Sequence, residues 1–339
     1  MEIKNIIIVG GGSAGWMTAA TLIHQFPKKN ITLIESPKTP TVGVGESTLG
    51  YIKGWMHLLD IDESFMKDCD ASYKLSIRFE HFHYPFGVPN LKGNNHLLND
   101  WYLANFYKKL PITDYADSLF PGMSLVNNKR LFKNKDNLLD GFNFKRDVAY
   151  HMDATKFGLW LKNSYCIPRG VKYISEDIDT ITLNNEGIES LNNKHKADLF
   201  IDCTGFRSLL LSKQLKEPFD SYEDILPNNS AWATKQPYTD KEKQINPYTD
   251  CKAVENGWIW NIPLWSRMGT GYVYSDKFIS DEDALKQFQG HIGTSELEFR
   301  NIKMRVGMHQ RLWVKNVCAI GLSAGFIEPL ESNGLFTVH

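Results

Sequence analysis

A glycine-rich hexapeptide near the start of the chain has the residue types and spacing to hold a dinucleotide. It follows the apolar run 6–9, typical of a buried parallel strand, and precedes apolar residues at helical spacing that end before Pro27. Small side chains let the backbone approach a pyrophosphate, whose charge the free N–H groups at the helix start would hold. The residues predicted to form this site are Gly10, Gly12, Ser13, Ala14 and Gly15.

Glu35 indicates which dinucleotide is bound. It ends a second apolar strand, 31–34, at the distance where a carboxylate usually accepts hydrogen bonds from a ribose hydroxyl. Because a carboxylate at this position argues against a 2′-phosphate, NAD or FAD is favoured over NADP.

Three later segments indicate that the nucleotide-binding lobe is discontinuous. The Gly-spaced segment 41–48 is predicted to be a loop that straps a flat cofactor, although taken alone it fits an ordinary tight turn almost as well. Apolar strands at 197–202 and 317–320 each run into a small-residue turn, where open α/β sheets bind ligands. The residues expected at the cofactor are Val44, Gly45, Glu46, Ser47, Gly321 and Ala324.

Two tryptophans, Trp258 and Trp260, precede a rigid Ile262-Pro263 step. Side chains two apart on a strand lie on the same face, so the pair fits either the filling of a core or a wall beside a ligand. The residues alone leave both interpretations open.

The intervening stretches 82–144 and 218–300 are rich in aromatic residues, Asn and Pro and lack a regular βα alternation, which indicates a second lobe. We expect a helix near 101–109 and a capped helix start at Ser280. The predicted fold class is α/β, with a Rossmann-like lobe and an interleaved mixed α+β substrate lobe. The Rossmann-like lobe is expected to comprise about 1–81, 145–217 and 301–339.

The composition is that of an ordinary soluble protein. The 339 residues are 42% hydrophobic and 23% charged, and a net charge of −1 gives no reason to expect a nucleic acid or a membrane as partner. No apolar run is long enough to span a bilayer and Met1 leads at once into the first strand, so a cytoplasmic protein is expected. Five scattered cysteines without C-x-x-C spacing predict reduced thiols, and no metal-ligand set is recognisable.

Four blocks occur in one order across nearly the whole chain: 10–15, 73–80, Trp258-x-Trp260-x-Ile262-Pro263, and 325–334, which reads GFIEPLESNG. Together they resemble the tryptophan-halogenase family of flavin-dependent halogenases. The fingerprint is shared with many flavoproteins, whereas the two-tryptophan motif distinguishes this family. The resemblance implies that the Rossmann-like lobe binds FAD, used as FADH2, as in flavoprotein monooxygenases.

Lys74 lies at the position of the family's catalytic lysine. The residues themselves alternate between apolar and polar from 73 to 80, which also fits a half-buried strand with an exposed lysine. If the ammonium is held inside the protein, it either hydrogen-bonds hypohalous acid or loses its proton through desolvation and forms a haloamine. Either state positions an electrophilic halogen.

The resemblance also assigns roles in the C-terminal block. Glu331 matches the catalytic glutamate that polarises the halogenating agent and accepts the ring proton, with Glu328 as the rival in a shifted register. Backbone N–H groups of Asn333 and Gly334 are expected to bind halide. Threonine is common in the family at position 333, which leaves the choice among chloride, bromide and iodide open. Trp258, Trp260 and Pro263 are expected to separate substrate from flavin.

The implied reaction is FADH2- and O2-dependent halogenation of an electron-rich aromatic ring, indole- or phenol-like, by hypohalous acid that Lys74 guides. A separate flavin reductase is expected to supply FADH2, because no nicotinamide site is evident. The alternatives are an FAD-dependent aromatic hydroxylase and a non-catalytic flavin-binding protein. The family's C-terminal helical region is expected to be absent after His339, which exposes apolar residues and favours a homodimer.

Overall fold

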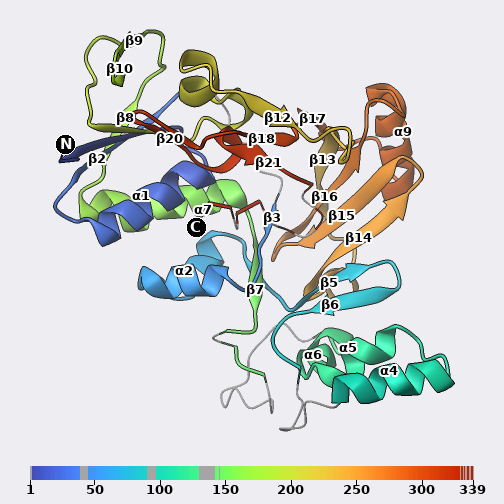
Figure 1. The fold of residues 1–339 in the computed structure, drawn as a ribbon. Coiled ribbons are helices and arrows are strands. Elements are labelled where there is room, and N and C mark those ends of the chain that lie inside the picture. The colour runs from blue at the N-terminus through green and yellow to red at the C-terminus, as the bar shows by residue number, and fades with distance from the viewer. Residues whose placement is uncertain are drawn as a thin grey trace.

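A six-stranded sheet forms the Rossmann-like lobe (Figure 1). The computed structural model describes residues 2–38, 45–89, 97–129, 142–144, 146–328, 330, 332, 334–335 and 337–338. The apolar run of β1 (Asn5–Val9) lies at its centre, parallel to β2 (Asn30–Glu35) and to β11 (Leu199–Asp202). The strand order is β19-β20-β11-β1-β2-β8, with β8 Lys172–Ser175, β19 Trp313–Val314 and β20 Val317–Ala319.

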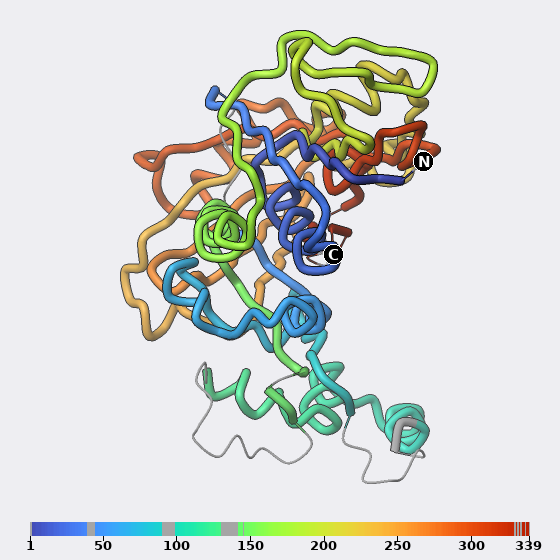
Figure 2. Tube along the Cα trace, turned by 90° about the vertical axis from the view of Figure 1, so that its left-hand side faces the viewer, coloured from blue at the N-terminus to red at the C-terminus, as the bar shows by residue number. Residues whose placement is uncertain are grey.

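Helices and a hairpin cover both faces of this sheet. Helix α1 (Ser13–Gln25) follows β1 and ends two residues before Pro27, as predicted, because proline cannot continue the helix. It packs beside α7 (Ala154–Trp160) and the π-helical turn η1 (Leu161–Cys166) (Figures 1 and 2). The opposite face packs against η4 (Leu209–Gln214) and the hairpin of β9 (Ile181–Asn184) and β10 (Gly187–Leu191).

A seven-stranded sheet forms the second layer, in the order β17-β13-β16-β15-β14-β5-β6. Its strands are β17 Arg300–Lys303, β13 Ser230–Pro237, β16 Arg267–Tyr274, β15 Gly257–Pro263, β14 Tyr248–Val254, β5 Ser76–Phe79 and β6 Phe82–Pro85. Helix α9 (Asp281–Ile292) covers one face, and the Ser280 hydroxyl accepts from the Asp283 N–H at its start, as the capping pattern predicts. Both tryptophans of β15 lie in the core on the other face.

Two small sheets lie between these layers (Figure 1). One has the order β3-β7-β4, with β3 Glu46–Ser47, β7 Ala149–Met152 and β4 Ser72–Lys74. The other has the order β12-β18-β21, with β12 Phe219–Ser221, β18 Gly307–His309 and β21 Gly325–Phe326. In the first sheet β7 therefore lies between the strap strand β3 and β4, which carries Lys74.

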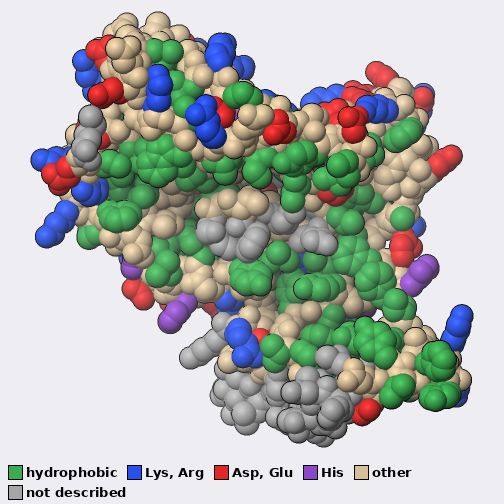
Figure 3. Space-filling view, viewed as in Figure 1, with side chains coloured by type: hydrophobic (Ala, Val, Ile, Leu, Met, Phe, Trp, Pro, Cys, Tyr) green, Lys and Arg blue, Asp and Glu red, His purple; other side chains and the backbone are tan. Residues whose placement is uncertain are grey.

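Helices α4 (Leu97–Tyr107), α5 (Thr113–Leu119) and α6 (Gly122–Asn127) gather at one end of the molecule (Figures 1 and 2). Hydrophobic side chains crowd this end (Figure 3), and the exposed ones on α4 are Tyr102, Leu103, Phe106 and Tyr107. The homodimer expected from the sequence stays a prediction. The remaining helices are α2 Ile52–Leu58, α3 Phe65–Asp68, α8 Lys241–Gln244, η2 Ile167–Arg169, η3 Gly205–Arg207 and η5 Gly321–Ser323. Among the described helices, none combines the length and the apolar character that a bilayer crossing requires.

Two local expectations are wrong. Part of the strap is not a loop, because Glu46–Ser47 pairs with β7. The segment 73–80 is not one half-buried strand, because Leu75 donates its N–H to Pro247 and divides it into β4 and β5 in different sheets. Strand β5, which we assigned to the nucleotide lobe, joins the seven-stranded sheet. The division into two lobes stays a prediction.

Candidate active site

The turn between β1 and α1 has the backbone geometry of a phosphate cradle. Gly10 adopts φ +115°, and a Cβ there would lie 2.2 Å from the Cys203 carbonyl oxygen. A Cβ on Gly15 would lie 1.9 Å from the Gly10 carbonyl oxygen, so the helix and the turn require glycine at this contact. Gly12, in contrast, faces open space within 4 Å of its Cβ position.

Among the described residues, no side chain occupies the N-terminus of α1, so this helix start can receive an anion. Gly12 precedes the helix, no side chain caps it, and its first turn holds no acidic residue. Glu35 lies at the end of the adjacent strand, where a Cβ on Gly11 would overlap its carboxylate, and it pairs with Lys162 at 3.5 Å. The positive end of the helix and the Glu35 carboxylate are thus both close to the glycine turn.

The predicted C-terminal cofactor turn meets this cradle. Gly321 adopts φ +68°, and a Cβ there would lie 2.9 Å from Cβ of Ala14, which shows that β20 delivers its turn to the start of α1. Ala324 donates its N–H to the Gly321 carbonyl and so closes this turn. Ser13 donates its hydroxyl to the carbonyl of Ala154.

The described part of the strap lies between the seven-stranded sheet and the C-terminal segment. A Cβ on Gly45, which has φ +112°, would contact Leu264 and Ile262 of the tryptophan-bearing region at 3.7–3.8 Å. Glu46 approaches the C-terminal segment, because a Cβ on Gly334 would lie 3.8 Å from its Oε2. The strap therefore lies next to two of the regions that the sequence assigns to the site, the one expected to bind halide and the one that carries the tryptophans.

Lys74 is completely buried, so the exposed lysine that the alternating pattern allowed is excluded. Its Nζ donates to the Thr48 carbonyl and to the Ser332 hydroxyl, both at 3.0 Å, and lies 5.0 Å from the centre of the Phe86 ring. Burial holds the pKa of its ammonium well below the usual value. A lysine in this state reaches the neutral amine far more readily than an exposed one.

Glu46 carries the second perturbed charge of the site. Burial, with a smaller effect of the nearby Asp153 charge, raises the pKa of its carboxyl from 4.5 to about 7. The folded protein therefore keeps a proton on Glu46 between pH 4.5 and 7 that the unfolded chain releases, and stability falls as pH rises through this window.

We predict that Glu46→Gln removes this pH dependence. In the flavin-free protein, urea unfolding should give equal stabilities for variant and wild type near pH 4, and a variant more stable by roughly 2 kcal/mol at pH 8, allowing for partial exposure of the carboxyl. Glu186→Gln, at an exposed carboxyl of the β9–β10 hairpin, serves as the control and should show no such gain. A difference that is constant with pH would contradict the prediction.

The tryptophan pair is fixed on one face of β15. The ring centres of Trp258 and Trp260 lie 6.1 Å apart. Position 271 of β16 requires glycine, because a Cβ there would lie 2.2 Å from the Trp260 ring. Trp258 donates its indole N–H to the Glu328 carboxylate, which also receives a bond from Asn228. The Nε1 of Trp260 is buried and has no partner among the described residues.

Glu328 accepts from Trp258 and Asn228, whereas Ser332 of the same segment lies against Lys74. The choice between Glu331 and Glu328 stays a prediction from the sequence. Glu331 itself, together with Asn333 and Val44, lies outside the described residues. Pro263, the last wall residue, ends β15 and accepts the Ser72 hydroxyl at 2.6 Å through its carbonyl.

Sequence reasoning missed three polar residues that meet the site from other elements: His151, Thr249 and Ser72. His151 and Ser72 form a pair in the register of β7 and β4, and Thr249 lies on β14. His151, Thr249 and Ser72 are all buried. The one sequence signal for them was a histidine inside the otherwise apolar stretch 148–152.

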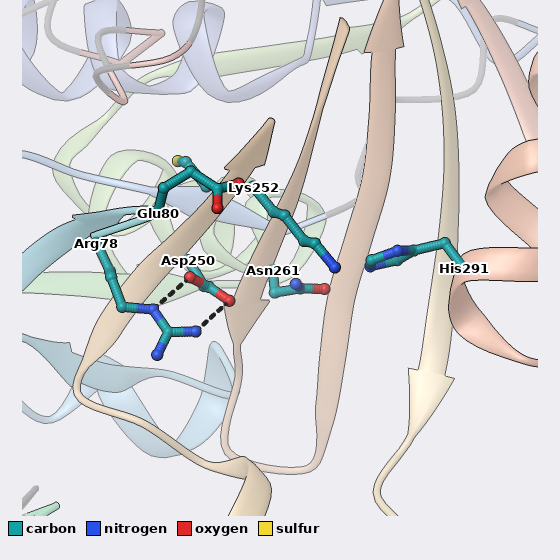
Figure 4. Close-up of a pocket in the computed structure, with 7 residues that line it drawn as sticks. Arg78, Glu80, Asp250, Lys252, Asn261 and His291 are labelled. Carbon is teal, nitrogen blue, oxygen red and sulfur yellow. Dashed lines mark hydrogen bonds and ion pairs between the residues drawn. The ribbon is translucent and has the colours of Figure 1, made fainter. Parts of the chain in front are cut away.

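A separate polar cavity of about 340 Å³ lies on the seven-stranded sheet (Figure 4). Arg78 pairs with Asp250 through two bonds of 2.6 and 2.8 Å, and Lys252 and His291 point toward each other across it. Asp250 is paired with Asn261, and the next pair along β14 and β15 is Cys251 with Trp260. Because successive side chains of a strand point to opposite faces of the sheet, Asp250 and Asn261 face away from the tryptophans. Cys251 lines this cavity and is also close to Lys74.

A Rossmann-like sheet with a glycine cradle at the start of α1, together with a completely buried lysine, defines an α/β oxidoreductase of the flavoprotein class. The family model described as "Tryptophan halogenase" matches residues 5–339. The chain belongs to the tryptophan halogenase family.

Individual relatives agree with this assignment. The chain is 36% identical to the 7-chloro-L-tryptophan 6-halogenase KtzR of Kutzneria sp. (strain 744), over 98% of this chain and 70% of the relative. It is 37% identical to the tryptophan 6-halogenase SttH of Streptomyces toxytricini, over 98% and 69%. Among solved structures, VirX1 superposes with a TM-score of 0.93 at 43% identity, over 100% of this chain and 68% of that one.

The family and fold confirm three predictions from the sequence: the α/β flavoprotein class, an oxidoreductase, and FADH2-dependent halogenation of an aromatic substrate. The comparisons favour neither the hydroxylase nor the non-catalytic binding protein.

Proposed function

We propose that this chain halogenates an indole- or phenol-like ring with hypohalous acid that Lys74 holds. The observation that supports this most strongly is the burial of Lys74, which is fully enclosed and 3.0 Å from Ser332 in the C-terminal block. A structural lysine would be expected to pair with a carboxylate when buried, whereas Lys74 donates to neutral oxygens in the described part of the chain.

FAD fits the residues present. The open space at Gly12, the uncapped start of α1 and the carboxylate of Glu35 suit a dinucleotide without a 2′-phosphate, and the free indole N–H of Trp260 offers a buried donor. When bound in its reduced form, the flavin supplies, with O2, the oxidising equivalents that convert halide to hypohalous acid. We assign its binding to Gly10, Gly12, Ser13, Ala14, Gly15, Glu35, Gly45, Glu46, Ser47, Gly321 and Ala324, with Val44 from the sequence.

Halide binding is assigned to the backbone N–H groups of Asn333 and Gly334. Glu46 supports this placement, because its raised pKa keeps the carboxyl near Gly334 largely neutral below pH 7, where it does not repel an anion. Chloride, bromide and iodide remain the candidate ions.

Lys74 then donates to hypohalous acid or reacts with it, and Glu331 takes the ring proton. The Trp258 and Trp260 wall, anchored by Glu328, keeps the ring from the flavin, which prevents hydroxylation. A separate flavin reductase supplies FADH2. The relatives' names suggest tryptophan as one ring to test, and the cytoplasmic location stays a prediction from the sequence.

The proposal is tested by product mass. The protein is incubated with FAD, a flavin reductase, NADH, O2 and a panel of indoles and phenols, in chloride, bromide, iodide and halide-free buffers. We expect a halogen mass shift that requires halide and disappears in Lys74→Ala. A halide-independent gain of oxygen would replace the proposal with a hydroxylase, and an inert folded protein that binds FAD would favour a binding role.

A further inference from the structure

A continuous chain of hydrogen bonds joins Lys74 to His151. Lys74 Nζ lies 3.0 Å from the Ser332 hydroxyl, which lies 3.0 Å from the Ser47 hydroxyl. Ser47 lies 2.5 Å from the Thr249 hydroxyl, which lies 2.9 Å from Nε2 of His151. Four structural elements, β4, the C-terminal segment, β3 and β14, thus connect the lysine to a histidine on β7.

The direction of these bonds is determined at both ends. The Ser72 hydroxyl donates to the Pro263 carbonyl at 2.6 Å, so its oxygen is left to accept from Nδ1–H of His151 at 3.4 Å. In this tautomer Nε2 has no proton and accepts a hydrogen bond from the Thr249 hydroxyl. At the other end, Lys74 can only donate, so Ser332 accepts from it and donates onward to Ser47. Every group gives its proton to the next one toward His151.

The chain is closed to solvent and holds two bases. Lys74 and His151 are completely buried, and Ser47, Thr249 and Ser332 are at most 9% exposed. In the described part of the protein, no carboxylate forms an ion pair or hydrogen bond with either base. Among the described residues, Cys251 is an ionisable group close to Lys74, and burial raises the pKa of its thiol to about 12, so it stays neutral. Burial, with a smaller effect of the Lys74 charge, holds the pKa of His151 well below its usual value, so His151 is neutral while Lys74 is charged and the pair holds one proton at a time.

We propose that His151 receives the proton that Lys74 loses, relayed through the hydroxyls of Ser332, Ser47 and Thr249, so that Lys74 meets hypohalous acid as a free amine. The inference rests on the proposed function of Lys74. Of the two ways in which Lys74 could position the halogen, a hydrogen bond to hypohalous acid or a haloamine, it favours the haloamine. His151 acts through Lys74 and does not touch the substrate.

The step balances. One proton leaves the Lys74 ammonium, each hydroxyl passes one proton on, and Nε2 of His151 gains one. The amine then attacks the halogen of hypohalous acid: an N–halogen bond forms, the O–halogen bond breaks, and one amine proton converts the departing hydroxide to water. When the halogen moves to the ring, the N–halogen bond breaks and a C–halogen bond forms; Glu331 takes the ring proton and passes it to the lysine nitrogen, which restores the amine. His151 then returns the first proton to Lys74.

The first test uses the folded wild-type protein without flavin. ¹⁵N-labelled histidine should give an NMR signal for His151 with an unprotonated Nε2 and a protonated Nδ1 at neutral pH, assigned by its loss in His151→Gln. The opposite tautomer would overturn the relay, because Nε2 would then donate to Thr249 and could not accept.

The second test removes one hydroxyl from the middle of the chain. Thr249→Val should lower kcat at least about tenfold with KM for the aromatic ring unchanged, and should slow haloamine formation on Lys74 by added hypochlorous acid in the flavin-free protein. Thr249→Ser keeps the hydroxyl and should stay within about threefold of wild type. Equal rates in Thr249→Val and wild type, or equal losses in both variants, would overturn the relay.

The outcomes separate this inference from the function on which it rests. Halogenation that persists in Lys74→Met would refute the role of the lysine itself. Loss in Lys74→Met with normal turnover in Thr249→Val would leave that role intact and refute only the relay. If Thr249→Val does not fold, the wild-type tautomer and the Thr249→Ser rate still decide.

Discussion

Replacing Lys74 with methionine is expected to lower the halogenation rate by about 10³-fold or more while the protein still folds and still binds FAD. The loss has this size because proton transfer and placement of the electrophile by one side chain each contribute factors of about 10² to 10⁴. Methionine matches the length of the lysine stem and fills the same space beside Phe86 without a nitrogen.

The same substitution should also make the protein more stable. Replacing a lysine that stabilises the fold would lower stability, so this gain distinguishes a lysine kept for chemistry from a structural one. Burial lowers the pKa of Lys74 below 10.5, so the unfolded chain binds more protons than the folded one between the lowered pKa and 10.5. Wild-type stability therefore rises with pH through this window, and the gain from Lys74→Met is largest at low pH. We expect a gain on the order of 1–3 kcal/mol near pH 6.

Denaturant unfolding and product analysis check both parts. Lys67→Met, at an exposed lysine of α3, provides the matched control and should change neither the rate nor the pH dependence of stability. An active Lys74→Met protein, or an inactive one that has lost stability at low pH, would refute the interpretation of Lys74 as a buried reactive base.

The parts of the fold that the sequence predicts well are those that local chemistry determines. The apolar run of β1, the glycine turn and the end of α1 before Pro27 each follow from neighbouring residues, and the structure places them where expected. Ser280 caps α9 for the same reason. Neither a long-range contact nor a charge is needed to specify these elements.

Burial of Lys74 could not be predicted in this way. The alternating pattern from 73 to 80 suggested an exposed polar face, but Lys74 pairs with Ala149 in the register of β4 and β7, 75 positions later in the chain. Ser332 closes the site from a segment 258 residues away. Only the resemblance to a family identified this lysine, because local periodicity carries no information about such contacts.

Thr249 shows the same limit for the hydrogen-bond chain. It belongs to a Pro-Tyr-Thr-Asp sequence that occurs twice in the chain, at 237–240 and 247–250, and nothing local distinguishes the copies. In the structure, only the second copy lies on β14 with its threonine buried between Ser47 and His151. A residue of this kind is found by its partners, which only the folded chain supplies.

Gly12→Ala and Gly15→Ala should separate flavin binding from folding within the same glycine turn. A methyl group at Gly15 would lie 1.9 Å from the Gly10 carbonyl oxygen, and backbone has to move to admit it. We expect Gly15→Ala to lose on the order of 3 kcal/mol or more of stability and, with it, flavin binding. This loss would be visible by urea unfolding without any cofactor.

Gly12→Ala should behave differently, because the position has no neighbour within 4 Å and an ordinary negative φ of −74°. Its methyl group would occupy the space over the start of α1 where a pyrophosphate has to approach the backbone, so we expect unchanged stability and a flavin affinity lower by about tenfold or more. Fluorescence titration with FAD and urea unfolding measure the two quantities independently. If Gly12→Ala bound FAD as tightly as wild type, the cofactor could not lie over this helix start, and the cradle would have to be explained by packing alone.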